Sequence, residues 1–164
     1  MGVEIRSAVA ADQTIIRRIV RAAQINPMGL DWRRFVVAED QDPKGFVEPL
    51  HATALLQKPF GSIVGVGQVK PHGDGSRELA SIAVIPERQG EGIASEIIRG
   101  LLGKETGTVY LTCRDALEGF YTRFAFRTIA RDAMPPYFRR IHRLANILMP
   151  LMRPGARLLV MKRD

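Results

Sequence analysis

The sequence has a single cysteine, Cys113, among its 164 residues. One thiol cannot form a disulfide within the chain, so the fold does not depend on an internal cross-link. The sequence also lacks an apolar run long enough to span a bilayer, and its first residues do not show the pattern of a secretory signal peptide. We therefore expect a protein of the reducing cytoplasm that does not act at a membrane.

Histidine is also scarce, with three residues that lie far apart in the chain: His51, His72 and His142. Their spacing does not fit that of zinc ligands, so we predict no metal site. The sequence shows neither internal repeats nor a sign of a second domain. Because 164 residues are enough for one domain with a sizeable core, we predict a single domain over residues 1–164.

Acidic residues are fewer than basic ones, with 17 Asp and Glu against 24 Lys and Arg, which gives a formal net charge of +7. Such an excess of positive charge is common in proteins that bind nucleic acid. Here the basic residues are spread over several predicted elements, and no RNP, zinc-finger or helix-turn-helix pattern is present. Nucleic acid is therefore disfavoured as the main ligand, and a generally basic surface is the simpler interpretation.

The stretch from Glu78 to Leu102 is the most informative part of the sequence. It begins as an apolar strand that Pro86 ends, because proline has no N–H to donate to a sheet. A turn with Gly90 and Gly92 follows, and then a helix whose apolar residues recur at helical spacing: Ile93, Ile97, Ile98, Leu101 and Leu102. A glycine turn before a helix can bind phosphate, because free amides and the helix dipole both favour negative charge there. On spacing alone a tight turn without a ligand is an equal alternative, because the stretch is neither a P-loop nor a dinucleotide fingerprint.

Two motifs, in this order, resemble those of the GNAT superfamily of N-acetyltransferases. The first is the run Gln89-Gly90-Glu91-Gly92-Ile93-Ala94, which is similar to the family's Gln/Arg-x-x-Gly-x-Gly/Ala motif. The second is the run Phe120-Tyr121-Thr122-Arg123-Phe124-Ala125-Phe126, which is similar to its Phe-Tyr-x-x-x-Gly-Phe segment. The likeness extends from about Ser62 to Ile129. Ala125 stands where the family usually has glycine, and we expect it to be tolerated because alanine also permits close packing.

The resemblance implies an α/β, GNAT-type acetyltransferase fold. In that fold a central mixed, mostly antiparallel sheet is flanked by helices and splays apart between strands 4 and 5. The sequence pattern agrees, because strands alternate with helices and a parallel crossover surrounds the glycine turn. The resemblance also implies that the pantetheine arm of acetyl-CoA lies in the V between the two splayed strands.

The resemblance further implies how acetyl-CoA, the acyl donor and cosubstrate, is held. One backbone stretch of the fourth strand is expected to pair with the pantetheine: Ile82, Ala83 and Val84. The glycine turn consists of Gln89, Gly90, Glu91, Gly92, Ile93 and Ala94, and its amides are expected to hold the pyrophosphate. Ser95 is expected to cap an exposed amide or a phosphate. Arg88 and Arg99 are further candidates for the phosphates, with ordinary solvated charges as the alternative. No metal is needed, because the thioester already activates the acyl group.

Acetyl transfer requires that the acceptor amine lose a proton, and the departing thiolate benefits from gaining one. The resemblance implies direct transfer from acetyl-CoA to a primary amine in a ternary complex, with Tyr121 as the acid. It also makes Glu78 the candidate base, acting through a water molecule. The alternatives are structural: Tyr121 as a half-buried aromatic residue, and Glu78 as a strand-end charge paired with a neighbour such as Arg77. We interpret Cys113 as a small buried residue rather than a nucleophile.

Periodicity and turn residues predict the other elements of the chain. Strands are expected at 3–8, 33–39, 61–70, 78–85, 108–113, 126–130 and 157–162. Helices are expected at 12–23, 93–102, 115–124 and 135–149, with Asp12 and Asp115 as caps and with Pro150 and Pro154 bounding the last turn. The polar, proline-rich segment at about 40–60 is interpreted as a flexible insertion. The last helix has an apolar stripe, which we interpret first as core and otherwise as a dimer face or a substrate wall: Ile141, Leu144, Ile147, Leu148 and Leu151.

Two other classes of function stay open. In one, the chain is a catalytically silent sensor that binds acetyl-CoA; in the other, it is a basic protein- or RNA-interaction domain. The acceptor also stays open between a protein N-terminus or lysine, a polyamine and a small amine-bearing molecule, and so does a homodimer. The basic surface disfavours polycationic acceptors, which it would repel.

Overall fold

The structure is a computed structural model that describes residues 2–41, 62–152 and 156–164. The chain forms two compact units. The first consists of Met1–Gln68 and Ser81–Lys104, and the second of Val69–Ala80 and Glu105–Asp164. The insertion predicted at about 40–60 lies almost entirely outside the described residues, and the single domain stays a prediction.

The first unit contains three strands that pair in succession. Strand β1 (Val3–Ser7) is antiparallel to β2 (Phe35–Asp40), and β2 is antiparallel to β3 (Ile63–Pro71). Strand β4 (Arg77–Val84) follows β3 through a hairpin and, like β3, has residues in both units. These strands agree with the sequence-based expectation to within two residues at each end, because their apolar runs are long and end at clear turn residues.

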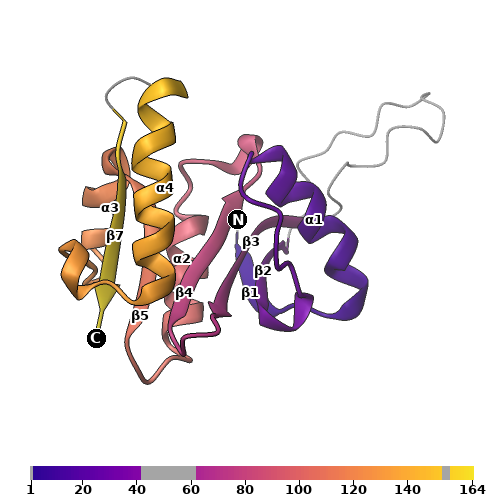
Figure 1. The fold of residues 1–164 in the computed structure, drawn as a ribbon. Helices are drawn as coiled ribbons and strands as arrows, with labels where there is room; N and C mark the ends of the chain where they lie inside the picture. Colours follow the sequence, from indigo (N-terminus) through magenta and orange to yellow (C-terminus); the bar gives the residue numbers. More distant parts are fainter. Residues whose placement is uncertain (1, 42–61, 153–155) are drawn as a thin grey trace. The chain divides into compact units, whose positions relative to one another are not determined.

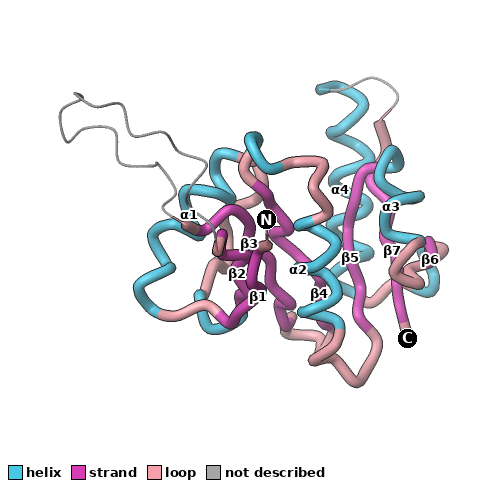
Figure 2. The backbone as a smooth tube through the Cα atoms, turned by 180° about the vertical axis from the view of Figure 1, so that it is seen from behind, coloured by secondary structure: helices cyan, strands magenta, loops and turns pink. Residues whose placement is uncertain are grey.

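Helices α1 (Gln13–Ala22) and α2 (Ile93–Leu102) cover opposite faces of these strands (Figure 1 and Figure 2). The side chains of a strand alternate between its two faces. Val66 of β3 lies in the core cluster that α1 forms with β2, whereas its neighbour Gly67 faces α2. A Cβ atom at Gly67 would stand 2.6 Å from the Ile97 side chain, so the glycine permits this close approach of the helix.

The apolar stripe predicted on α2 is confirmed as core. Each of its members is at most 7% exposed: Ile93, Ile97, Ile98, Leu101 and Leu102. Helix α1 buries a similar stripe: Ile16, Ile19 and Val20. Burial of these two stripes on the strands between them gives the first unit its hydrophobic core.

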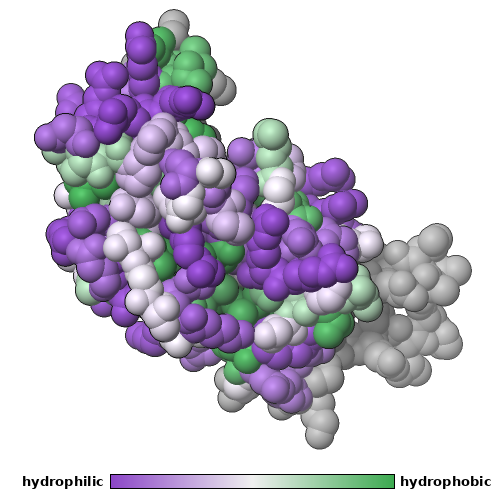
Figure 3. Space-filling model, turned by 60° about the horizontal axis from the view of Figure 1, so that its bottom comes forward, coloured by the Kyte–Doolittle hydropathy of each residue, from purple (hydrophilic) through white to green (hydrophobic). Residues whose placement is uncertain are grey.

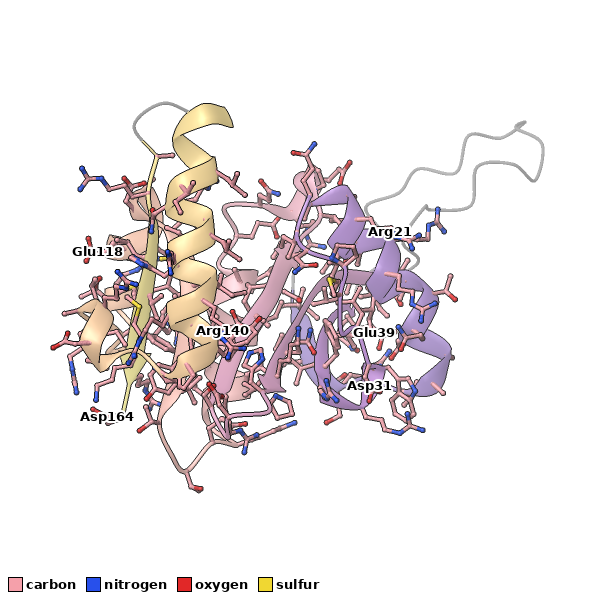
Figure 4. The ribbon with its side chains drawn as sticks, in the orientation of Figure 1. Arg21, Asp31, Glu39, Glu118, Arg140 and Asp164 are labelled. Atoms are coloured by element: carbon pink, nitrogen blue, oxygen red, sulfur yellow. The ribbon has the colours of Figure 1, made fainter. Side chains whose placement is uncertain are left out.

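Asp12 occupies the predicted cap position, because α1 begins at the next residue, but its side chain does not make the expected capping hydrogen bond. The Asp12 carboxylate accepts instead from the Val9 amide at 2.9 Å and from the Arg6 guanidinium at 2.8 Å. Arg6 also donates to Glu39, which is labelled in Figure 4, at 2.6 Å. The cation from β1 therefore draws the Asp12 carboxylate away from the helix amides.

The second unit is built on β5 (Val109–Arg114) and β6 (Arg127–Thr128), which both pair antiparallel with β7 (Leu158–Arg163). Strand β5 is also parallel to β4, with Tyr110 opposite Glu78. The hydrogen-bonded order of the seven strands is β1-β2-β3-β4-β5-β7-β6. This mixed, mostly antiparallel sheet with flanking helices confirms the predicted α/β fold.

Helix α3 (Glu118–Thr122) is shorter than predicted, because a 3-10 turn at Asp115–Leu117 precedes it. The Asp115 side chain accepts from the adjacent Ala116 amide at 3.0 Å and lies inside the 3-10 turn rather than at the start of α3, so the cap predicted there is wrong. Strand β6 is shorter than predicted as well. Phe126 and Ile129 are both buried, and a spacing of three does not fit the two-residue period of a strand. Glu118 of α3 accepts from the β6 hydroxyl of Thr128 at 2.5 Å (Figure 4).

Helix α4 (Pro136–Met152) runs past Pro150, which was expected to bound the following turn. A proline this near the helix end removes one backbone hydrogen bond without ending the helix. The interpretation of the apolar stripe as core is also wrong for three of its members, which are 62%, 58% and 56% exposed: Leu144, Ile147 and Leu148. Ile141 is half-buried, and the side chain of Leu151 lies outside the described residues.

The rotation of α4 about its axis explains this exposure. The Asn146 side-chain amide donates to the Leu158 carbonyl at 3.1 Å and accepts from the Leu158 amide at 3.0 Å. Phe138, two turns earlier and on the same side, is fully buried. These contacts direct the Phe138–Asn146 side of the helix toward β7 and leave the aliphatic stripe in solvent, with Arg140 on the exposed side (Figure 4).

Hydrophilic residues make up most of the surface in view in Figure 3. This agrees with a sequence in which 25% of the residues are charged. Among the helices of the described ranges, none is both long and apolar enough to cross a membrane.

Candidate active site

The glycine turn of the first unit has the geometry of an anion site. A 3-10 turn at Pro86–Arg88 follows β4, and Gly90 and Gly92 then adopt φ values of 86° and 85°. Gly92 is the residue that precedes the first turn of α2, and no side chain of the described residues caps the amides of this helix end. Exposed amides at a helix N-terminus favour negative charge. The turn therefore offers backbone donors where the pyrophosphate was predicted to bind.

The predicted members of this site differ in exposure. Four are exposed, and they are Gln89, Gly90, Glu91 and Gly92. Ile93 is buried in the core, so only its backbone can take part, while Ala94 and Ser95 are half-buried. The Gln89 side chain donates to the Val84 carbonyl at 3.0 Å. This bond ties the turn to the end of β4 and explains why a glutamine suits the first position of the motif.

Arg88 was a candidate for binding phosphate, but its guanidinium group contacts two carboxylates. Its Nε atom lies 2.9 Å from Glu91, and it also forms an ion pair with Asp40. These carboxylates raise the pKa of the Arg88 guanidinium, chiefly through the hydrogen bond to Glu91. Arg88 therefore fixes the turn and neutralises Glu91, which would otherwise repel an anion.

Strand β4 contains an irregularity just before the residues predicted to pair with pantetheine. Ser81 has a φ of 57°, the left-handed conformation found at β-bulges. Ala83 is buried in the α1 cluster, whereas Ile82 and Val84 are half-buried. The carbonyl of Val84 accepts one hydrogen bond, from the Gln89 side chain.

Gln68 of β3 lies beside this irregularity and is fully buried. Its Nε2 atom donates to the Ser81 hydroxyl at 3.1 Å and reaches the Gly29 carbonyl at 3.5 Å. Its Oε1 atom has no hydrogen-bond partner among the described residues. The buried position of Gln68 does not follow from the sequence, because a glutamine within an apolar strand is equally consistent with an exposed edge.

In the second unit, Glu78 is buried, with 8% of its surface exposed. One carboxylate oxygen accepts from the Thr112 hydroxyl at 3.1 Å, and the other lies 2.9 Å from Nε2 of His72. The predicted alternative, a pair with a basic neighbour such as Arg77, holds for His72 but not for Arg77, which forms an ion pair with Glu105 at 2.8 Å. Glu78 is thus a buried carboxylate without a guanidinium or ammonium partner among the described residues.

The sequence analysis missed His72. The backbone amide of His72 donates to the Ser76 carbonyl at 2.9 Å in the hairpin. Glu78 lies two residues beyond Ser76, on the same face of the hairpin, where a diagonal cross-strand contact is within reach. The signal that could have found His72 is therefore the hairpin register rather than any motif.

Tyr121 lies on α3 and is half-buried. Its ring packs edge-on against Phe120, with centroids 5.1 Å apart, and against Phe126 at 6.2 Å. Burial raises the pKa of the Tyr121 hydroxyl to about 12, with a smaller contribution from Cys113. The hydroxyl is therefore protonated at neutral pH. No hydrogen bond to it is found within the described residues, so it is available as a donor.

Cys113 is 5% exposed, as its interpretation as a small buried residue requires. Burial raises the pKa of its thiol to about 11, with further contributions from Glu118 and Asp115. Because the thiolate is the reactive form, this thiol is a poor nucleophile at neutral pH. Within residues 2–41, 62–152 and 156–164, no three His, Cys, Asp or Glu side chains are grouped so as to hold a metal ion.

Comparison with known proteins gives the class of this chain. Residues 31–128, more than half of its length, match the family described as the acetyltransferase (GNAT) domain. Together with the fold, this match gives the class of the chain as a GNAT-type acetyltransferase domain. The chain belongs to the GNAT acetyltransferase family. The search of curated proteins finds no match to it.

Several solved structures have a similar fold. N-acetylglutamate synthase from Neisseria gonorrhoeae, complexed with coenzyme A and N-acetyl-glutamate, is 16% identical with a TM-score of 0.66 and covers 99% of this chain. Only 35% of that longer protein is covered in return, so the present chain spans about a third of its length. Rv2747 from Mycobacterium tuberculosis, in complex with CoA and NLQ, is 20% identical over 96% of this chain and 97% of its own, with a TM-score of 0.63. Escherichia coli ElaA is 12% identical over 99% of both chains, also with a TM-score of 0.63.

Proposed function

We propose that this protein transfers the acetyl group of acetyl-CoA directly to a primary amine in a ternary complex. Glu78 acts as the base through a water molecule, and Tyr121 acts as the acid. The observation that carries this proposal is the environment of Glu78. Glu78 is buried, its two carboxylate oxygens are held by His72 and Thr112, and no guanidinium or ammonium group contacts it among the described residues.

In the proposed reaction, the ammonium group of the acceptor gives one proton through water to Glu78, and the neutral nitrogen then attacks the thioester carbon. The carbon–sulfur bond breaks, and the departing thiolate takes the proton of the Tyr121 hydroxyl. The nitrogen loses its second proton as the amide forms, and this proton restores the Tyr121 hydroxyl. With a pKa of about 12, this hydroxyl is protonated at neutral pH. A hydroxyl without a partner in the described residues can donate to sulfur without first breaking another hydrogen bond. The products are the N-acetylated amine and free coenzyme A.

The glycine turn is proposed to hold the pyrophosphate of acetyl-CoA. The open space at Gly90 and Gly92 supports this, because a Cβ atom built on either would contact nothing within 4 Å. The exposed N-terminus of α2 supplies the matching partial positive charge. The pantetheine is proposed to pair with the backbone of Ile82, Ala83 and Val84.

For the acceptor, we propose a small amine that carries a carboxylate, with glutamate as the first candidate. Two considerations support this choice. The net charge of +7 favours an anionic over a cationic acceptor. One similar structure is of a protein named N-acetylglutamate synthase and contains N-acetyl-glutamate.

The test is a screen of amines for release of free thiol from acetyl-CoA, which begins with glutamate and includes polyamines and a lysine peptide. We expect turnover with at least one amine and none in a Glu78→Gln/Tyr121→Phe double variant, which serves as the control. Calorimetric binding of acetyl-CoA without turnover of any amine would favour the silent sensor instead. Salt-sensitive binding to nucleic acid without affinity for acetyl-CoA would favour the interaction domain.

A further inference from the structure

The start of α4 contributes side chains that the proposed reaction does not use. The Tyr137 amide donates to the Asp74 carboxylate at 2.9 Å, so the hairpin between β3 and β4 caps this helix. Hydrogen bonds from Ser76 and from this amide lower the pKa of Asp74 to about 2. The carboxylate is therefore charged, as a helix cap should be, over the whole neutral range.

The aromatic rings of this helix start hold His72. The Tyr137 ring is stacked on the imidazole, with centroids 3.5 Å apart and planes inclined by 20°. Phe138, which is fully buried, meets the imidazole edge-on at 5.6 Å. The His72 side chain is 5% exposed. Two rings at a steep angle to each other thus fix both the position and the plane of the imidazole.

The imidazole in turn fixes the Glu78 carboxylate. The proposed base role requires an ionised Glu78, which can only accept hydrogen bonds, and in that state Nε2 of His72 carries the hydrogen in the 2.9 Å contact. The second oxygen is held by Thr112 at 3.1 Å, so each oxygen has its own donor. A carboxylate held on both oxygens cannot rotate freely about its last bond.

We propose that the start of α4 is a positioning element for the base: Tyr137 and Phe138 fix His72, and His72 together with Thr112 orients Glu78. This inference rests on the proposed role of Glu78. His72 is a positioning residue, because it acts through Glu78 rather than on the substrate.

The first test compares two replacements of His72. His72→Leu removes the hydrogen bond, and we expect kcat to fall by about 10- to 100-fold because a misplaced base acts poorly. His72→Gln keeps an N–H donor at a similar reach, and we expect it to stay within about threefold of the wild type. The affinity for acetyl-CoA should be unchanged in both. Equal losses in the two variants would overturn the proposal.

The second test separates positioning from a general structural defect. His72→Leu is also made in the Glu78→Gln protein, where there is no base left to position. We expect no further loss of kcat there, since residues that act as one unit are not additive. The same loss in both backgrounds would overturn the inference while leaving the base role intact. If Glu78→Gln alone is fully active, the proposed function fails first.

Should His72→Leu not fold, Tyr137 provides the same test from a greater distance. Tyr137→Phe keeps the stacked ring, and we expect a kcat within about twofold of the wild type. Tyr137→Leu removes the ring, and we expect an intermediate loss of kcat that disappears in the Glu78→Gln background. A Tyr137→Leu protein with wild-type kcat would overturn the role of α4.

Discussion

Ala125 gives a prediction about stability whose size follows from one backbone angle. Its φ is 64°, so an alanine occupies the left-handed region immediately after α3. Its amide donates to the Thr122 carbonyl at 3.0 Å, which closes the end of the helix. The sequence analysis expected Ala125 to be tolerated because of its small size. The structure shows that backbone conformation, not packing, is the reason why a glycine suits this position.

Two opposing terms set the effect of Ala125→Gly. Left-handed conformation costs a residue with a Cβ atom about 1–2 kcal/mol, and glycine removes this cost. Glycine also makes the unfolded chain more flexible, which costs about 0.4–1 kcal/mol. Ala125 is exposed, so little burial is lost with its methyl group. We expect a net gain of about 0.5–1 kcal/mol, or about 1–4 °C in Tm for a chain of this size.

The assay is thermal and urea unfolding of Ala125→Gly beside a matched control. Ala130 is also exposed and lies outside the helices and strands, but its φ of −70° is ordinary. Ala130→Gly should therefore only make the unfolded chain more flexible, which lowers the free energy of unfolding by about 0.4–1 kcal/mol. If Ala125→Gly destabilises the protein as much as Ala130→Gly does, the reasoning from the backbone angle is refuted.

Three further predictions concern the site and its surroundings. Gly92→Val should weaken acetyl-CoA binding at least tenfold by calorimetry. Gly75 has a similar φ, 83° against 85° for Gly92, so Gly75→Val is the control and should only lower stability. Equal affinities of the two variants for acetyl-CoA would contradict the phosphate site. Tyr121→Phe should lower kcat by about a hundredfold with Tm and acetyl-CoA affinity retained, and a fully active variant would exclude the acid role. The folded pKa of Asp74 is about 2 against an ordinary 3.8, so its stabilising contribution is complete above about pH 4 and is lost as the pH falls toward 2. In Asp74→Asn, acid titration of stability should be shallower over this range, and identical titration curves would contradict the hydrogen-bonded carboxylate.

Local pattern was enough to predict the elements that surround the glycine turn. The apolar stripe of α2 has helical spacing, and all of it is buried, because a helix with its apolar residues on one side packs that side against the core. The glycine turn was predicted from its own residues, and its two left-handed glycines have the conformation that only glycine adopts without strain.

Features that depend on side-chain contacts between one element and the next did not follow from the pattern within a single element. The exposed side of α4 is set by Asn146 and the Leu158 backbone, and nothing in the helix sequence reveals that contact. The Asp12 carboxylate accepts a hydrogen bond from Arg6 of β1, and capping rules do not take such a competing cation into account. His72 was dismissed as an isolated histidine, although the hairpin brings it to Glu78.

The most direct test of the account is the pH dependence of turnover in Glu78→Gln. Thiol release is measured from about pH 6 to 10 at saturating acetyl-CoA and with the best acceptor from the amine screen. We expect kcat at neutral pH to fall by about a hundredfold, since glutamine keeps the shape of the side chain but cannot take a proton. The loss should shrink as the pH rises, because more of the acceptor amine is then already neutral. A pH–rate profile of Glu78→Gln that overlays that of the wild type would contradict the central claim that Glu78 is the base.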